Sequence, residues 1–300
     1  MMQVSSLKKE KSINQLYLLV VQMRPGQWTK NLLVFAALVF SLKSVTIDMV
    51  IKSVYGFILF LLVSSCVYIL NDFVDREADR QHPVKRYRPL ASGMLNPQLT
   101  MVFGGMLLIT CLGLSALFSV PFSILLTLYF VVNVLYSTAL KQVVILDVMI
   151  IASGFVLRAI GGAVLINVKL TPWFLICIML LSLFLAISKR RHEFILSQES
   201  NVVSRKVLHF YNKQLLDQMN SIVTTATLIS YALFTFTSGR TIYLMWTIPL
   251  VFYGIFRYLY LIHVEGKGGD PDKILFEDKH ILGTVLLYAV SVILILRYFE

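Results

Sequence analysis

Charged residues are scarce in this sequence. Asp, Glu, Lys and Arg make up only 14% of its 300 residues, whereas 57% are hydrophobic. Soluble domains usually contain about 25% charged residues and about 45–50% apolar ones. One globular core cannot hide such an excess of apolar side chains, so the composition excludes an ordinary soluble protein. It predicts an all-α, polytopic membrane protein whose surface is solvated mainly by lipid.

Cysteine is also rare. Cys66, Cys111 and Cys177 lie inside apolar runs at irregular spacing, which favours buried thiols over a disulfide or a metal site. The N-terminal stretch MMQVSSLKKEKSINQ is basic and polar, and it lacks the short apolar core and small-residue cleavage site of a secretory signal. We therefore expect residues 1–16 to remain as a cytoplasmic N-terminal segment.

Long apolar runs fill most of the chain. A helix that spans a bilayer needs about 20 mostly apolar residues, and about nine runs approach this length. The first is the least regular, because the stretch MRPGQWTKN interrupts it. Together the runs predict a single transmembrane domain over residues 1–300, with helices at 17–42, 48–70, 98–118, 120–139, 143–166, 171–188, 219–238, 240–262 and 281–299.

The charges that do occur are concentrated in alternate connecting segments. Most of the 27 lysines and arginines fall there, and so do most of the acids. Because cytoplasmic loops are enriched in Lys and Arg, these segments are expected to face the cytoplasm across the inner (plasma) membrane. Since both signs of charge gather on this side, we also expect a polar chemical site in a cytoplasm-facing cavity. The segments are 1–16, 71–97, 140–142, 189–218 and 263–280.

The stretch YILNDFVDREAD, at the end of the second apolar run, carries the densest group of acids. If the helix continues through Asp79, then Asp72, Asp75 and Asp79 share one face, with Asn71 one turn before Asp75 and Tyr68 one turn before Asp72. Clustered carboxylates repel one another unless a cation lies between them. Oxygen-only ligands favour Mg²⁺, and no His or Cys cluster suggests zinc. The pattern predicts Asn71, Asp72, Asp75 and Asp79 as magnesium ligands.

The next residues reverse the sign of the charge. Lys85, Arg86 and Arg88 follow the acids and are themselves followed by PLASG. Bases beside a metal-loaded row of acids suit a phosphorylated anion, because Lys neutralises it as a point charge and Arg binds it in a bidentate way. For any one of these bases, a solvated loop that obeys the positive-inside rule is an equally good interpretation.

The sequence NDFVDREADRQHPVKRYRPLASG resembles the first aspartate-rich motif of the UbiA-type intramembrane prenyltransferase superfamily. Other stretches resemble one branch of it, the decaprenyl-phosphate phosphoribosyltransferases, also called 5-phosphoribosyl-1-phosphodecaprenol synthases. These stretches are RPGQWTKNLLVFAALVFS, LDVMIIASGFVLRAIGGAV, KRRHE and RYLYLIHVEGKGGDPDKILFEDK. The resemblance covers nearly the whole chain and implies a UbiA-like helical bundle that forms one catalytic domain.

One departure from the wider superfamily bears on the substrates. Aromatic prenyltransferases usually carry a second pair of acids one turn apart, whereas Asp147 stands alone here, with Lys141 and Arg158 as its nearest bases. Fewer acids and more bases favour a more anionic pair of substrates. The resemblance therefore implies Mg²⁺-dependent transfer of 5-phosphoribose from phosphoribosyl pyrophosphate to a polyprenyl phosphate, with release of diphosphate. Asp72 and Asp75 would be the catalytic acids.

The remaining roles are implied by the resemblance, position by position. We expect Arg158 to pair with Asp147 or to face the polar cavity, because an unpaired charge in mid-span is costly. We expect Glu193 to orient its basic neighbours. Two of these roles have a plainer alternative. Lys30 could simply extend its ammonium group from the membrane to the polar interface, and residues 189–190 could be a basic cluster that ends a membrane span. The substrate-binding residues would be Lys30, Tyr68, Lys85, Arg86, Arg88, Tyr136, Lys141, Asp147, Arg158, Lys189 and Arg190.

Two other functions fit parts of the pattern. The first is transfer of a prenyl chain from a prenyl diphosphate to an aromatic or other small acceptor, against which the lone second acid argues. The second is transport of an anion, which intramembrane bases would suit, although no inverted repeat is visible. The net charge of +11 follows the topology rule, so we expect no nucleic-acid partner. The pattern does not specify an oligomeric state.

Overall fold

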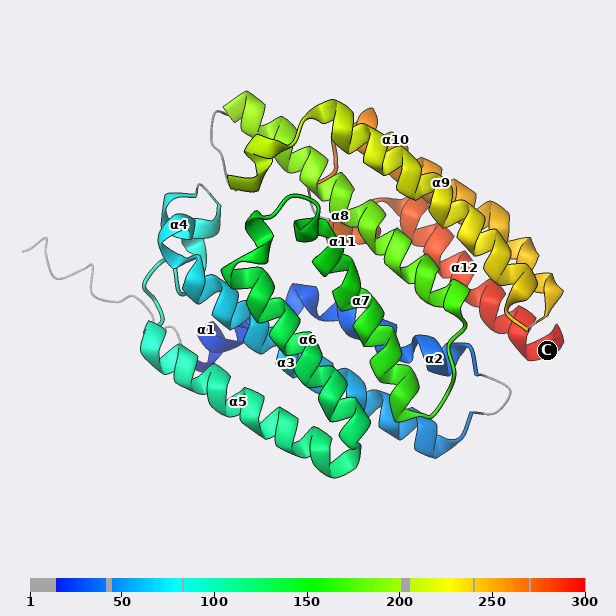
Figure 1. The fold of residues 1–300 in the computed structure, drawn as a ribbon, viewed down its shortest axis with the longest axis horizontal. Helices are drawn as coiled ribbons and strands as arrows, with labels where there is room; N and C mark the ends of the chain where they lie inside the picture. The colour runs from blue at the N-terminus through cyan, green and yellow to red at the C-terminus, as the bar shows by residue number, and fades with distance from the viewer. Residues whose placement is uncertain are drawn as a thin grey trace, which may run out of the picture.

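A computed structural model describes residues 15–41, 45–82, 84–200, 206–239, 241–269 and 271–299. All regular structure in these ranges is helical and none of it is β-strand, which confirms the predicted all-α fold (Figure 1). Most of the expected N-terminal segment 1–16 lies outside the described residues. Within them, eight helices are long and apolar enough to cross a membrane.

The long helices match eight of the predicted spans. They are α3 (Ile47–Val74), α5 (Pro97–Phe118), α6 (Val120–Thr138), α7 (Leu146–Leu165), α8 (Pro172–Ser200), α9 (Lys213–Thr237), α10 (Ile248–His263) and α12 (Lys279–Phe299), with the 3-10 turn η6 (Ile242–Thr247) completing the span of α10. Shorter elements join them: α4 (Arg76–Gln81), η3 (Lys85–Tyr87), η4 (Leu140–Gln142), η5 (Lys206–Phe210) and α11 (Pro271–Glu277).

The span expected at 17–42 is not one helix. It is divided into α1 (Gln15–Gln22), the 3-10 helix η1 (Pro25–Phe35) and α2 (Ala36–Val39). The break falls at Arg24, whose backbone is left-handed with φ 55°, directly before Pro25. The proline ring disfavours a right-handed helical residue before it and removes a backbone N–H, so α1 cannot continue.

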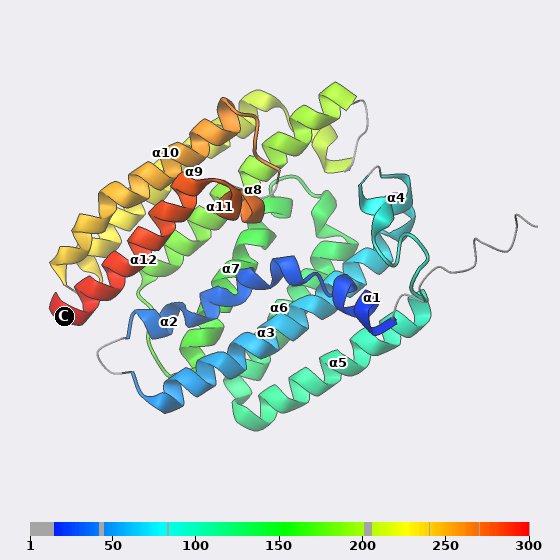
Figure 2. The ribbon, with the colours of Figure 1, turned by 180° about the vertical axis from the view of Figure 1, so that it is seen from behind.

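In the described parts of the chain, the charged connecting segments lie toward one end of the bundle, and they contain more helix than expected (Figures 1 and 2). Helix α8 does not stop near residue 188 and instead runs to Ser200. Arg190 and Glu193 are three residues apart on it and form an ion pair, which is a favourable spacing on a helix. The segment 263–280 includes α11.

The interrupted first segment packs closely against α7 and α3. Figure 2 shows it crossing both helices. A Cβ atom at Gly162 of α7 would stand 1.9 Å from the carbonyl oxygen of Val34, and one at Gly161 would stand 2.5 Å from the ring of Phe60. Only glycine permits this approach. A core that includes Phe60, Phe122 and Tyr129 fills the space beside the crossing.

We predict that Gly162→Ala destabilises the protein by about 1–3 kcal/mol, because the new methyl group would overlap the Val34 carbonyl and force η1 away from α7. Thermal unfolding in detergent would measure the change. Gly105→Ala on α5 is the matched control, since nothing lies within 4 Å of its added Cβ. Equal melting temperatures for the two variants would contradict this account of the crossing.

Candidate functional site

The acidic stretch does not form one continuous helix. Helix α3 ends at Val74, and Asp75, with φ −89° and ψ 3°, separates it from α4. The expectation of a single helix through Asp79 is therefore wrong. Residues 75–80 are all charged except for one alanine, so no apolar stripe holds them to the helix axis of α3. Asp itself is a weak helix former because its carboxylate competes for nearby backbone N–H groups.

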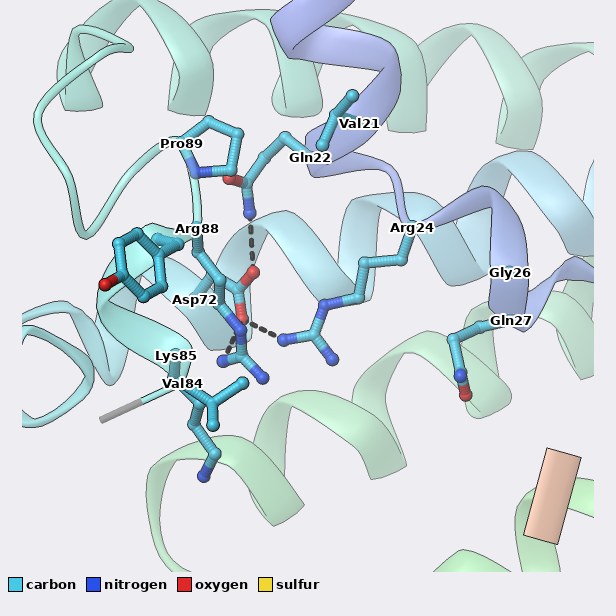
Figure 3. Close-up of a pocket in the computed structure, with 11 residues that line it drawn as sticks. Val21, Gln22, Arg24, Gly26, Gln27, Asp72, Val84, Lys85, Arg88 and Pro89 are labelled. Carbon is cyan, nitrogen blue, oxygen red and sulfur yellow. Dashed lines mark hydrogen bonds and ion pairs between the residues drawn. The ribbon is translucent and has the colours of Figure 1, made fainter. Parts of the chain in front are cut away.

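Asp72 is the most enclosed acid of this stretch, with 2% of its surface exposed. Gln22 donates its Nε2–H to Oδ2 at 2.6 Å, and the guanidinium of Arg24 contacts Oδ1. Arg88 Nη1 lies 3.1 Å from the same Oδ1 atom. Figure 3 shows these three side chains converging on Asp72 from α1, from the turn before η1 and from the loop after η3.

Two of the predicted substrate-binding bases, Arg88 and Lys141, form ion pairs with the acids. Arg88 Nη1 lies 2.5 Å from Oδ2 of Asp79, so one guanidinium joins Asp72 to Asp79. Lys141, on η4 between α6 and α7, places its Nζ 2.5 Å from Oδ1 of Asp75. Together with Arg24, these bases neutralise the acids of the stretch 72–79 from three other parts of the chain.

Gln22 and Arg24 belong to the site although they were not among the predicted residues. Gln22 is 1% exposed, and its Oε1 also accepts the backbone N–H of Leu90 at 3.2 Å. Arg24 stacks over the ring of Tyr68 at 5.2 Å. The signal that points to Arg24 is its place in the stretch RPGQWTKN, where a base and a helix-breaking proline interrupt an apolar run.

A cavity of about 450 Å³ opens beside Asp72. Arg24, Lys85 and Arg88 supply its cationic wall, while Val21, Val84 and Tyr87 supply apolar surface (Figure 3). Such a wall is suited to a phosphate group. Arg86 lies outside the cavity lining, since its guanidinium donates to the Tyr87 hydroxyl at 2.8 Å.

The other predicted residues occupy several elements. Lys30 is on η1, Tyr68 on α3, Tyr136 on α6 and Lys189 on α8, and each of these side chains is half-buried. None of them lines the cavity beside Asp72. Their roles in substrate binding stay predictions.

Of the two alternatives for Arg158, the pairing with Asp147 is wrong. The two residues are eleven positions apart on α7, and at about 1.5 Å per residue they lie roughly three turns from each other. Asp147 instead forms an ion pair with Arg190 Nε at 2.7 Å and accepts a hydrogen bond from the Tyr211 hydroxyl at 2.7 Å. Arg190 also contacts Glu193, as predicted.

Asp147 and Arg190 neutralise each other inside the protein. Their exposed fractions are 0% and 2%. The Tyr211 hydroxyl also accepts the backbone N–H of Ile145 at 2.8 Å, where the chain adopts a positive φ of 70° just before α7. Burial and the bond to Asp147 raise the pKa of Tyr211, so it remains a hydrogen-bond donor at neutral pH. The cluster therefore joins the start of α7 to α8 and to the segment before α9.

Within the described residues, no group of three acidic, histidine or cysteine side chains converges on one point that would hold a metal ion. The donor chemistry at the end of α3 nevertheless fits a hard cation, because Asn71, Asp72 and Asp75 offer only oxygen. Asp75 is the more open of the two carboxylates, with its side chain 31% exposed and held by Lys141. A cation at Asp75 would compete with that lysine.

His82 links the acids to the basic loop. Its Nδ1 accepts the backbone N–H groups of Val84 at 3.2 Å and Lys85 at 3.3 Å. Partial burial, and then the charge of Lys85, lower the pKa of His82 from its ordinary value of 6.5. The ring is therefore neutral at neutral pH and is able to accept these bonds.

We predict that the loop 84–88 loosens in acid. Because the folded-state pKa of His82 is depressed, the stability from its two contacts is complete above pH 6.5 and is lost as the pH falls through the lowered pKa. Hydrogen exchange of the Val84 and Lys85 amides on either side of that range measures the effect. His82→Asn keeps an acceptor that does not titrate, so it should abolish the pH dependence. An unchanged pH dependence in His82→Asn would rule out this role.

The fold and the site together define a class: a multi-pass helical membrane protein in which one end of the bundle sets acids against bases around a cavity. The chain matches the model of the UbiA prenyltransferase family over residues 32–276. It belongs to that family.

Curated relatives and solved structures agree with this assignment. The decaprenyl-phosphate phosphoribosyltransferase of Mycolicibacterium smegmatis is 32% identical, covering 87% of this chain and 86% of the relative. That of Corynebacterium glutamicum is 31% identical, covering 92% and 86%. The structure of a UbiA homolog from Archaeoglobus fulgidus bound to GPP and Mg²⁺ has a TM-score of 0.71 at 18% identity, covering 92% of this chain and 99% of that one. These comparisons confirm the UbiA-like bundle and identify the chain as a membrane transferase.

Proposed function

We propose that the protein is a polyprenyl-phosphate phosphoribosyltransferase, a glycosyltransferase of the pentosyl class. It transfers 5-phosphoribose from phosphoribosyl pyrophosphate to a polyprenyl phosphate of the decaprenyl type and releases diphosphate. Relatives that align with most of the chain carry the name decaprenyl-phosphate phosphoribosyltransferase, which supports both the acceptor and the group transferred.

The observation that carries the proposal is the number of cations around the acids at the end of α3. Arg24, Lys85 and Arg88 line one cavity with the buried Asp72. Lys141 approaches from η4. Both proposed substrates are phosphate anions, and a site rich in bases offsets the repulsion between them. The soluble donor and the lipid acceptor would meet at the cytoplasmic face of the inner membrane, where the positive-inside rule puts these bases.

Mg²⁺ is the proposed cofactor. Asn71, Asp72, Asp75 and Asp79 would hold it, with Asp72 and Asp75 as the catalytic acids. A bound cation of this kind supplies neutralisation of the charge on the diphosphate leaving group. The Mg²⁺ and GPP bound to the Archaeoglobus fulgidus homolog support the use of a divalent ion with a diphosphate in this fold.

In the proposed reaction an oxygen of the lipid phosphate bonds to C1 of the ribose as the bond from C1 to the diphosphate breaks. Attack from the opposite face inverts the anomeric centre. The attacking phosphate is already an anion at neutral pH, so no side chain has to remove a proton. The work of the chain is to bind and orient two anions, for which Arg24, Lys85, Arg88 and Lys141 are placed.

Prenyl transfer to an aromatic or other small acceptor is the second candidate, favoured by the GPP in the structure of the Archaeoglobus fulgidus homolog. The second acid position argues against it. Asp147 stands alone there, without a second acid one turn away, so this position offers fewer carboxylates for additional metal ions than the acidic stretch after Tyr68 does.

The test compares two substrate pairs with the protein purified in detergent: labelled phosphoribosyl pyrophosphate with decaprenyl phosphate, and labelled prenyl diphosphate with an aromatic acid. We predict transfer only with the first pair, and its loss on chelation of divalent ions. Asp75→Asn should lower kcat by about 100-fold or more, since it removes a charge that acts on the leaving group through the cation.

Glu77→Gln is the matched control for Asp75→Asn. Glu77 lies two residues away on the exposed outer side, where it pairs with Arg76 and Arg80. It should retain near wild-type activity. Transfer of the prenyl group instead of phosphoribose would replace the proposal with the second candidate. Turnover in detergent, where no gradient exists, would exclude a pure anion transporter.

A further inference from the structure

Arg158 is a cation buried in the middle of α7. It is 5% exposed, and its hydrogen bonds go to three neutral oxygens. Nε donates to Asn31 Oδ1 at 2.8 Å, Nη1 to the Gly154 carbonyl at 2.8 Å and Nη2 to the Tyr129 hydroxyl at 2.7 Å. Within the described part of the chain, no carboxylate lies within ion-pair distance of it. A charge buried in this way is costly and needs a reason.

The contacts of Arg158 tie it to the protein interior. Each of its three nitrogens is engaged, and the guanidinium lies 4.8 Å from the ring centre of Tyr129 and 5.4 Å from that of Phe155. The planar fork and the two rings stabilise the cation where it lies. Its environment is that of a residue that holds other residues in place.

Asn31 is the residue through which Arg158 reaches the site. It is fully buried, and its Nδ2 donates to Ser64 Oγ on α3 at 3.2 Å and to the Trp28 carbonyl at 3.2 Å. Its Oδ1 accepts from Arg158. One amide therefore joins η1 to both α3 and α7, and Arg158 adds α6 through Tyr129.

The segment that Asn31 holds needs such support. Helix η1 is a 3-10 run of 11 residues, whereas 3-10 helices rarely exceed about four because their hydrogen bonds are poorly aligned. Trp28 Nε1 adds a bond to Ser65 Oγ at 3.2 Å. Arg24, which contacts Asp72, lies immediately before this run, and Lys30 lies within it.

We propose that Arg158 is a positioning residue, which fixes η1 through Asn31 so that Arg24 meets Asp72 and Lys30 keeps its place within η1. The stretches RPGQWTKN and LRAIGG are then one structural unit rather than two separate sets of substrate ligands. The activity arm of the test rests on the proposed function, whereas the position of η1 is measurable without it.

The first arm follows η1 directly. Gly26→Cys places a thiol at an exposed position that lines the cavity, where no atom lies within 4 Å of the added Cβ. We expect Arg158→Lys, which keeps the charge but loses the fork, to change the rate of maleimide labelling of this thiol several-fold. Arg297→Lys, at the exposed end of α12, is the control and should not change the rate.

The second arm separates positioning from general loss of stability. Arg24→Gln should lower phosphoribosyl transfer by about 10-fold or more in the wild type, the usual size of a lost charge-assisted hydrogen bond. In the Arg158→Lys background Arg24 is already displaced, so the same substitution should cost about 3-fold or less. A purely structural role for Arg158 would leave the factor for Arg24→Gln unchanged.

A second pair of variants serves if Arg158→Lys does not fold. Asn31→Asp keeps an oxygen acceptor for Arg158, whereas Asn31→Leu has a similar size and no acceptor. Asn31→Asp also loses the Nδ2 bonds to Ser64 and Trp28, so labelling at Gly26→Cys should change less in Asn31→Asp than in Asn31→Leu. Identical labelling in both would overturn the proposal.

A second result would also overturn it: a higher KM for one anionic substrate in Arg158→Lys, with labelling unchanged, would make Arg158 a substrate ligand. Absence of transfer in the wild type would refute the proposed function and leave the labelling result standing.

Discussion

The buried carboxylate of Asp72 is the group on which the arrangement of the site depends. A carboxylate with 2% exposure needs both charge neutralisation and hydrogen bonds, and here they come from Gln22, Arg24 and Arg88. These partners belong to segments that are far apart in the sequence. Satisfying one acid therefore draws α1, the start of η1 and the basic loop to the end of α3, and the cavity is the space that they enclose.

The interrupted first segment follows from the same constraint. Arg24 has a left-handed backbone, which costs a residue other than glycine about 1–2 kcal/mol. Such strain persists only where the surroundings determine the conformation. The contact with Asp72 holds one side of this turn, and the bond between Asn31 and Arg158 holds the segment that follows. The first segment is thus part of the site rather than a simple membrane anchor.

Much of the fold could be predicted because apolar run length alone indicates a membrane helix. The meeting of Arg88 with Asp72 and Asp79 was also accessible, since acids and bases of one loop have few other places to go. The pairing of Asp147 with Arg190 could not be predicted from the sequence, because it depends on the rotation of α7 and α8 about their axes. The break at Asp75 could not be predicted either, since it depends on partners outside the local sequence. Gln22 gave no signal, because a lone glutamine at the edge of an apolar run has many possible roles.

The most direct test of this account is a double-mutant cycle between Asp72→Asn and Arg88→Gln, read by unfolding of the purified protein. Neighbours that share a buried charge contact should show a coupling energy of about 1–3 kcal/mol, so that the second substitution costs much less once the first is present. The exposed pair of Asp48 and Lys52, at 2.7 Å, supplies the reference and should show about 0.5 kcal/mol or less. Additive costs for Asp72 and Arg88 would contradict the claim that base pairing of this acid organises the site.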